Sequence, residues 1–222
     1  FANCSQLTIP HVGSLAYYPN RDSLSYIPLY ELETAETFIR TTLRYAPFCL
    51  GWEKIVQAQL TNDEEMVDTS ALSYSQFFQN HLNKNQVELN SPELVEQFHF
   101  LGLNDPTIIN KGTLSVAQIL QEILEDKWKL QAGDKDLIVM LHELEYSINH
   151  KQFALQSSLV VKGDDELHTA MAKTVGLPLG IAAVLILENK IAIKGLHIPI
   201  IKEIYEPVLA ELIKEGIAFE ET

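Results

Sequence analysis

The sequence predicts an α/β protein of the α+β kind, with a mixed, largely antiparallel sheet and flanking helices, interrupted by an all-helical insertion. At residues 37–45 and again at residues 137–161, β-branched and aromatic residues alternate with polar ones at period two. Between them, residues 50–130 carry helix caps and apolar residues at helical spacing. We therefore expect residues 1–49 and 131–222 to form one α/β domain and residues 50–130 to form a helical insertion subdomain.

The composition is that of an ordinary soluble globular protein, since 46% of the 222 residues are hydrophobic and 21% are charged. A formal net charge of −14 disfavours nucleic acid as a partner, because a polyanion would be repelled over most of the surface. Two cysteines, Cys4 and Cys49, offer no disulfide framework and no multi-cysteine metal site. No histidines and carboxylates have metal-ligand spacing, so no metal is expected.

The expected location is cytoplasmic. The N-terminus lacks a basic segment followed by an apolar one, and the apolar run Ile181–Leu187 falls well short of the roughly 20 residues that span a bilayer. No membrane partner is therefore expected. The chain opens on Phe1 without an initiator methionine, which suggests a piece of something longer.

Residues 1–18 predict short strands, and a cluster of turn-forming residues follows at residues 18–23. This loop holds Asn20 and Arg21. It is either a solvated turn with local charge pairing or a loop that takes part in binding. A short helix is expected over residues 24–32.

Residues 37–45 alternate with period two and predict a half-buried strand with Arg40, Thr42 and Arg44 on one face. Arginine presents a planar fork of donors that matches a carboxylate, and the two guanidiniums start about 7 Å apart along such a strand. The face therefore suits a di-acid or an amino acid. The alternative is a solvent face on which the arginines meet surface carboxylates.

The insertion carries local helix-start signals. Ser73 with Gln76 predicts a capping box, Ser91 followed by Pro92 predicts a cap and a first-turn proline, and Thr113 or Ser115 opens a further helix. Its aromatic residues are expected to form a small core.

From Asp136 the pattern returns to strands. Residues 137–146 and 153–161 predict an antiparallel hairpin with a turn at Asn149–His150, and His142 falls on its apolar face as an expected core histidine.

The stretch from Ala170 to Lys190 predicts a helix, a sharp corner and a second helix. Gly176 suits the left-handed conformation that closes a helix, and Pro178 suits the first turn of the next. Asp164 and Asp165 are expected to cap the first helix. The second is apolar all round, which is typical of buried core.

Several familiar motifs are missing. The sequence has no G-x-G-x-x-G after a strand, no phosphate-cradling G-x-x-x-x-G-K and no G-x-S-x-G. The residues alone thus indicate an α/β domain with a helical insertion and a possible di-acid site.

Three stretches together resemble the C-terminal half of the saccharopine dehydrogenase (L-glutamate-forming) family. They are YPNRDS at residues 18–23, RTTLRY at 40–45, where relatives usually have Gly in place of Thr41, and TAMAKTVGLP at 169–178. The tail segments GLHIP at 195–199 and KEIYEPVL at 202–209 are similar as well.

The resemblance implies an oxidoreductase of lysine metabolism that transfers a hydride reversibly at a secondary amine or imine. The family binds NAD(P) on an N-terminal Rossmann domain, binds an amino-acid or dicarboxylate substrate on a second domain that also forms a homodimer, and covers the site with a third, helical domain. This chain would hold most of the second domain and the third. No cofactor is then expected on this chain alone, no catalytic residue is assigned to it, and the fragment is expected to be inactive.

The resemblance also implies substrate-binding residues. An arginine of the strand holds a substrate carboxylate in the family, and Arg44 is the first choice here, before Arg40. The remaining candidates are Thr42, Asn20, Arg21, Lys173, Thr174 and Gly176. The alternatives are a carboxynorspermidine-type or other opine-forming dehydrogenase, and a catalytically silent amino-acid-binding paralogue.

Overall fold

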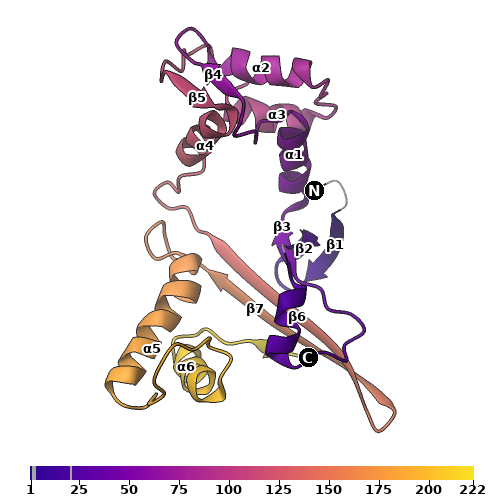
Figure 1. Ribbon diagram of the computed structural model, residues 1–222, viewed down its shortest axis with the longest axis vertical. Coiled ribbons are helices and arrows are strands. Elements are labelled where there is room, and N and C mark those ends of the chain that lie inside the picture. Colours follow the sequence, from indigo (N-terminus) through magenta and orange to yellow (C-terminus); the bar gives the residue numbers. More distant parts are fainter. Residues whose placement is uncertain (2–3, 21) are drawn as a thin grey trace. The chain divides into compact units, whose positions relative to one another are not determined.

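The computed structural model describes residues 1, 4–20 and 22–222 and divides into two compact units, Phe1–Lys129 and Leu130–Thr222 (Figure 1). The predicted fold class is confirmed, since helices are mixed with antiparallel sheets in the described part of the chain. The division falls within one residue of the predicted end of the insertion. That residues 1–49 and 131–222 form one domain stays a prediction.

The first unit opens with a three-stranded antiparallel sheet in the order β1-β2-β3. The strands are β1 (Ser5–Ile9), β2 (Gly13–Pro19) and β3 (Thr41–Arg44), and two single 3-10 turns, η1 (Leu24–Tyr26) and η2 (Pro28–Tyr30), lie in the long β2–β3 connection. The third strand is shorter than the predicted 37–45. One further rung precedes it, because the Asn20 backbone N–H donates to the Arg40 carbonyl at 2.9 Å.

Four helices and a two-stranded sheet make up the rest of the first unit (Figure 1). They are α1 (Ala46–Gln57), β4 (Met66–Asp68), α2 (Tyr74–Lys84), α3 (Pro92–Leu101), β5 (Thr113–Ser115) and α4 (Val116–Lys127). The β4–β5 pair was not predicted, so this region is not purely helical. Its first helix also begins four residues before the predicted boundary.

The predicted helix starts in this region are confirmed. The hydroxyls of Ser73 and Ser115 each accept from the backbone N–H three residues on, and a glutamine at that position bonds back to the serine N–H. Ser91 likewise caps α3 ahead of its first-turn proline. The helices close on one core in which Phe77, Phe78 and Phe98 are almost entirely buried.

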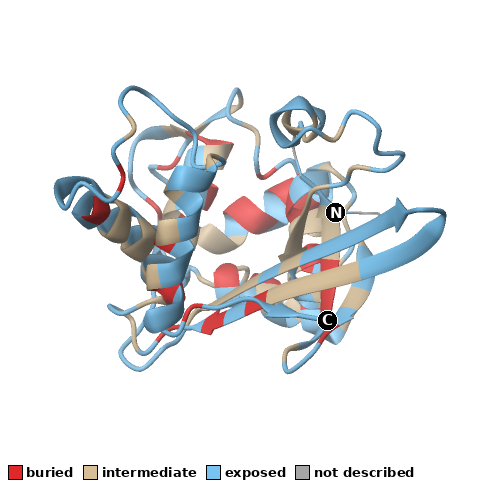
Figure 2. Cartoon of the chain, turned by 90° about the horizontal axis from the view of Figure 1, so that it is seen from below, coloured by how far each residue is buried: buried red, intermediate tan, exposed pale blue. Residues whose placement is uncertain are grey.

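The second unit is built on a long hairpin that continues into a short third strand. Strands β6 (Leu137–Ile148) and β7 (Lys151–Lys162) pair over their full length, and β8 (Glu220–Glu221) adds to β7. Asn149 and His150 form the predicted turn with φ of 50° and 63°. The half of the hairpin nearest this turn is exposed (Figure 2). His142 lies in that exposed half, against the prediction, with its ring 5.6 Å from that of Phe219.

The predicted corner at residues 170–190 is not a break between two helices. A π-helical turn, η3 (Ala172–Gly176), runs directly into α5 (Leu177–Leu187), and Gly176 has a right-handed φ of −70°. Pro178 has no N–H to donate, and the wide π turn removes the need for an α-type bond at this point. Asp164 and Asp165 do not cap this helix, because its first N–H groups bond to Asp136.

The second helix of this stretch is not buried core. Leu185 is the only buried residue of α5, whereas Leu179 and Leu187 are 74% and 82% exposed. One face of α5 packs on the hairpin and on α6 (Lys202–Lys214), and the other faces outward. Helix α6 contains Pro207 rather than starting at it. Within the described residues, no helix is both long and apolar enough to cross a membrane.

Candidate functional site

The β2–β3 strand pair brings four of the predicted site residues onto neighbouring rungs of one sheet. Thr42 lies opposite Tyr18, Arg44 lies opposite Ala16, and the Arg40 carbonyl accepts from the Asn20 backbone N–H. These four residues are Asn20, Arg40, Thr42 and Arg44. Arg21 lies outside the described residues.

Arg40 is oriented by an aromatic contact. Its guanidinium carbon lies 4.0 Å from the centroid of the Tyr26 ring, and Tyr26 stacks on Tyr30 with centroids 6.0 Å apart. A guanidinium over a ring face is attracted by the ring quadrupole, and the donors on its edge remain free to point elsewhere. The 3-10 turns of the β2–β3 connection thus hold this arginine against the sheet.

Arg44 ends β3 and is exposed, immediately before the N-terminus of α1. Its Nη1 donates to the Leu43 carbonyl at 2.7 Å, and its guanidinium carbon lies 5.8 Å from the Phe48 ring. No side chain caps α1, so the partial positive charge of that helix end lies near the guanidinium. A carboxylate at this place would meet both.

Neither arginine is used in an ion pair within the described chain. The salt bridges between described residues all involve lysines or His168 as the cation. With 30 acidic residues against 16 basic ones, partners of opposite charge are plentiful in this protein. That this face binds a substrate, rather than being a solvent face, stays a prediction.

The other predicted site residues lie in the second unit, on the π turn and the residues around it. Lys173 Nζ bonds to Asp164 Oδ1 at 2.7 Å and to the Lys162 carbonyl at 3.4 Å. The Thr174 hydroxyl donates to the Ala170 carbonyl at 2.9 Å, within the helix. The ammonium and the hydroxyl thus already have protein partners. Gly176 has open space where a side chain would lie.

Asp136 positions this turn, and the sequence analysis did not identify it. Its carboxylate accepts from the backbone N–H groups of Ala170 at 2.6 Å and Met171 at 2.9 Å. Gly163 leaves the space for that carboxylate, because a Cβ at this position would overlap Asp136 Oδ1 and press on the backbone of Thr169 and Ala170. The only signal in the sequence is an Asp immediately before a strand, which is too common to be diagnostic.

The two groups of candidate residues lie in different units of the chain. Their union in a single site stays a prediction.

The described residues do not form a dinucleotide-binding cradle. All of their strand pairs are antiparallel, and no glycine-rich turn links a strand to a helix as a pyrophosphate site requires.

The family profile described as "Saccharopine dehydrogenase C-terminal domain" matches residues 1–217. Alpha-aminoadipic semialdehyde synthase, mitochondrial, from Mus musculus is 34% identical over 93% of this chain and 24% of its own length. The saccharopine dehydrogenase [NADP(+), L-glutamate-forming] of Schizosaccharomyces pombe is 26% identical over 92% of this chain and 50% of its own length.

A solved structure, apo saccharopine dehydrogenase (L-Glu forming) from Saccharomyces cerevisiae, has the same fold. It superposes with a TM-score of 0.87 at 26% identity and covers 100% of this chain and 54% of its own. The chain thus spans about half the length of these fungal relatives and a quarter of the mammalian ones.

Proposed function

Because the chain belongs to the saccharopine dehydrogenase C-terminal domain family, we propose that it is the substrate-binding and dimerisation part of a saccharopine-dehydrogenase-like oxidoreductase. In this proposal the dicarboxylate substrate lies on the β2–β3 face. NAD(P) binds to a Rossmann domain outside this chain, as the NADP(+) in the names of the fungal relatives suggests.

The observation that carries the proposal is the pair of arginines without carboxylate partners. Arg44 ends β3 and Arg40 directly precedes this strand, in a protein with net charge −14, and no described carboxylate pairs with either of them. A charge-assisted, bidentate bond to a substrate carboxylate is the interaction that such guanidiniums are built to make. Lys173, Thr174 and Gly176 are proposed as a second wall, and Asn20, Arg21 and Thr42 as supporting residues.

Substitution of Arg44 in the complete enzyme tests the proposal. Arg44→Ala should raise KM for saccharopine by about 2–4 kcal/mol in binding terms, roughly 30- to 700-fold, with little change in cofactor affinity. Arg44→Lys keeps the charge but loses the forked guanidinium, so its KM should lie between those of the wild type and Arg44→Ala. An unaltered KM in Arg44→Ala would remove Arg44 from the site.

The substrate itself is tested by turnover. The complete enzyme should act on glutamate plus aminoadipate semialdehyde rather than on a diamine plus aspartate semialdehyde, which is the alternative for an opine-forming relative. Activity with neither pair would favour the silent paralogue.

Self-association follows from the same proposal. The exposed apolar face of α5, with Leu179, Val184 and Leu187, is a surface that a second copy would cover favourably. The 222-residue chain alone should sediment as a dimer and show no dehydrogenase activity. A monomer at micromolar concentration would contradict the dimerisation part. The cytoplasmic location also stays a prediction, and mammalian relatives are named as mitochondrial proteins.

A further inference from the structure

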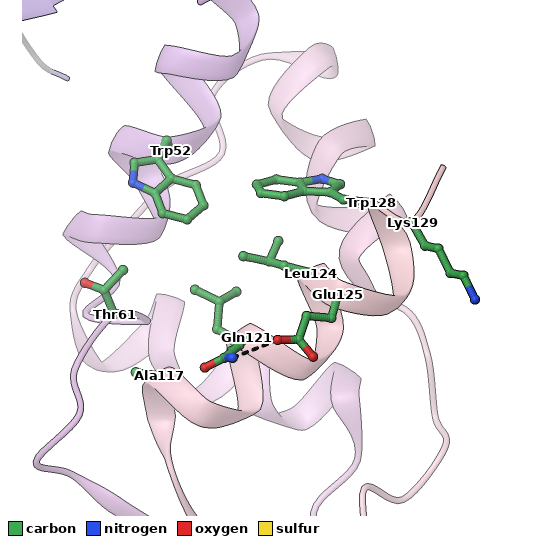
Figure 3. A pocket seen from close by; sticks show the side chains of 9 residues that line it. Trp52, Thr61, Ala117, Gln121, Leu124, Glu125, Trp128 and Lys129 are labelled. Carbon is green, nitrogen blue, oxygen red and sulfur yellow. Dashed lines mark hydrogen bonds between the residues drawn. The ribbon is translucent and has the colours of Figure 1, made fainter. Parts of the chain in front are cut away.

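A groove in the first unit, near the end of β3, is lined by both tryptophans of the chain. Trp52 lies on α1 and Trp128 directly follows α4, with their ring centroids 6.0 Å apart. The groove has a volume of about 490 Å³, within the range of small-ligand sites. Figure 3 shows the two indole rings on the same side as Leu124, over the surface of α4.

The indoles are held in place by further rings. Phe48 stacks on Trp52 with centroids 5.7 Å apart and an interplanar angle of 12°, and it also contacts Trp128 at 6.0 Å. Trp128 is nevertheless 49% exposed. The aromatic rings therefore form a preformed wall that faces solvent, and the core of the first unit does not cover it.

One carboxylate lies beside this wall. Glu125 Oε1 accepts from Gln121 Nε2 at 2.7 Å, one helical turn earlier on α4 (Figure 3). Among the described residues, no lysine or arginine nitrogen lies within ion-pair distance of Glu125, and the nearby Lys127 pairs with Asp126 instead. The Lys129 side chain lines the groove but extends away from the rings (Figure 3).

The chemistry of this combination is specific. Indole faces attract cations, a carboxylate with an unused oxygen accepts from an ammonium, and leucine side chains pack against an alkyl stem. The electrostatic field of the first unit also favours a cation, because residues 1–129 carry 16 acidic and 8 basic side chains.

We propose that this groove binds a small primary ammonium with an aliphatic stem, with the ammonium at Glu125 and the stem against Trp52, Trp128 and Leu124. The proposal does not rest on the proposed substrate-binding function, because Glu125, Trp52 and Trp128 are not residues of β2 or β3. The two places adjoin, since Phe48 contacts both Trp52 and Arg44.

Intrinsic fluorescence tests the proposal directly, since Trp52 and Trp128 are the only tryptophans of the 222-residue chain. The probes are n-pentylammonium and uncharged 1-pentanol, each titrated at constant ionic strength. We expect a saturable change of emission with both, and half-saturation by the ammonium at a concentration about 10-fold lower.

Two matched variants separate the carboxylate from the general field. Glu125→Gln keeps the shape of the side chain and a partner for Gln121, and it should raise the half-saturating concentration of the ammonium to that of pentanol. Asp126→Asn makes the same charge change on the next residue of α4, whose side chain is 80% exposed and outside the groove, and it should leave binding unchanged. Circular dichroism establishes that both variants are folded.

Three outcomes overturn the proposal. Equal half-saturation by ammonium and alcohol in the wild type would show an apolar groove without charge selection. Equal weakening in Glu125→Gln and Asp126→Asn would show a diffuse electrostatic effect. No saturable response to either probe would show no site.

Discussion

The helical region of the first unit and the second unit satisfy their apolar residues in different ways. The helices of residues 46–127 enclose a core in which Phe77, Phe78 and Phe98 are almost inaccessible, and few of their large apolar side chains, such as Leu50 and Phe100, are exposed. In the second unit, α5 and the distal half of the hairpin leave Leu144, Ile148 and Leu187 exposed (Figure 2). The first region exposes few large apolar side chains, and the second exposes many.

This difference indicates which region depends on something else. A region with capped helices and a single enclosed core needs no partner to be stable. Exposed apolar area of the second kind is characteristic of surfaces that another chain or domain covers. We therefore expect substitutions in the first region to act on folding, and those on the outer face of α5 to act on association.

The largest expected effect contrasts Phe98→Ala with Leu187→Ala. Removing the buried Phe98 ring should lower the free energy of unfolding by about 3–5 kcal/mol, because the helices cannot close the cavity. Leu187 is 82% exposed, so its truncation should cost less than about 0.5 kcal/mol. Urea unfolding followed by circular dichroism at low protein concentration measures both. If both variants lost the same free energy of unfolding, Leu187 would have to be covered in solution, and the contrast between the two regions would be contradicted.

A smaller effect is expected at Asp136, which is the local anchor of the second unit. Asp136→Ala removes the acceptor for the Ala170 and Met171 N–H groups and should destabilise the second unit by about 1–2 kcal/mol. Asp136→Asn keeps one acceptor oxygen and should lose less. Hydrogen exchange of these two amides reports the change locally. Unchanged protection in Asp136→Ala would mean that the carboxylate does not hold the turn.

The pH dependence of the first unit should come partly from His81. Burial lowers the pKa of His81 in the folded chain, and its Nδ1 has no hydrogen-bond partner among the described residues. Below pH of about 6.5 the unfolded chain therefore binds a proton that the folded chain does not, and the free energy of unfolding falls.

Urea unfolding between pH 7.5 and 5.5 measures this loss, and His81→Leu should remove that part of the slope. Identical slopes in the two proteins would contradict the assignment.

The smallest effect has the opposite sign and lies in the second unit. The exposed His168 ring is 3.0 Å from Asp165 Oδ2, and that carboxylate raises the pKa of His168. The contribution to stability is present below pH of about 6.5 and is lost as pH rises through the raised pKa. An NMR titration of His168 should show a lower midpoint in Asp165→Asn. The same midpoint in both proteins would show that the pair does not form in solution.

Local signals explain why much of the fold was predictable. Ser73, Ser91 and Ser115 each begin a helix through bonds to residues three positions on, and the turn at Asn149–His150 needs only its two left-handed residues. The β4–β5 pair joins residues almost 50 positions apart, and three-residue strands carry too little pattern to be recognised. The prediction that α5 is buried was wrong. An apolar helix indicates that some surface packs against it, but that surface need not belong to the same chain.

The part of the candidate site that lies on a strand was predictable from the sequence. Alternation placed Arg40, Thr42 and Arg44 on one face, and their pairing with β2 then brings Asn20 beside them. The role of Asp136 depends on a contact across 34 positions, for which the sequence has no local pattern. The groove between Trp52 and Trp128 was missed because the aromatic residues of this region were all assigned to its core.

Strand β8 also affects the order in which the parts of the protein can fold during translation. Residues Phe1–Lys129 form a compact unit by themselves, so this unit can fold on the ribosome while the remainder is being made. The sheet of the second unit pairs Ser157 of β7 with Glu221 of β8 and therefore stays incomplete until more than 60 further residues have been synthesised. For that interval Ser157 and Ser158 of β7 have no strand partner on this edge, which is when a chaperone or a neighbouring nascent chain has most opportunity to bind there.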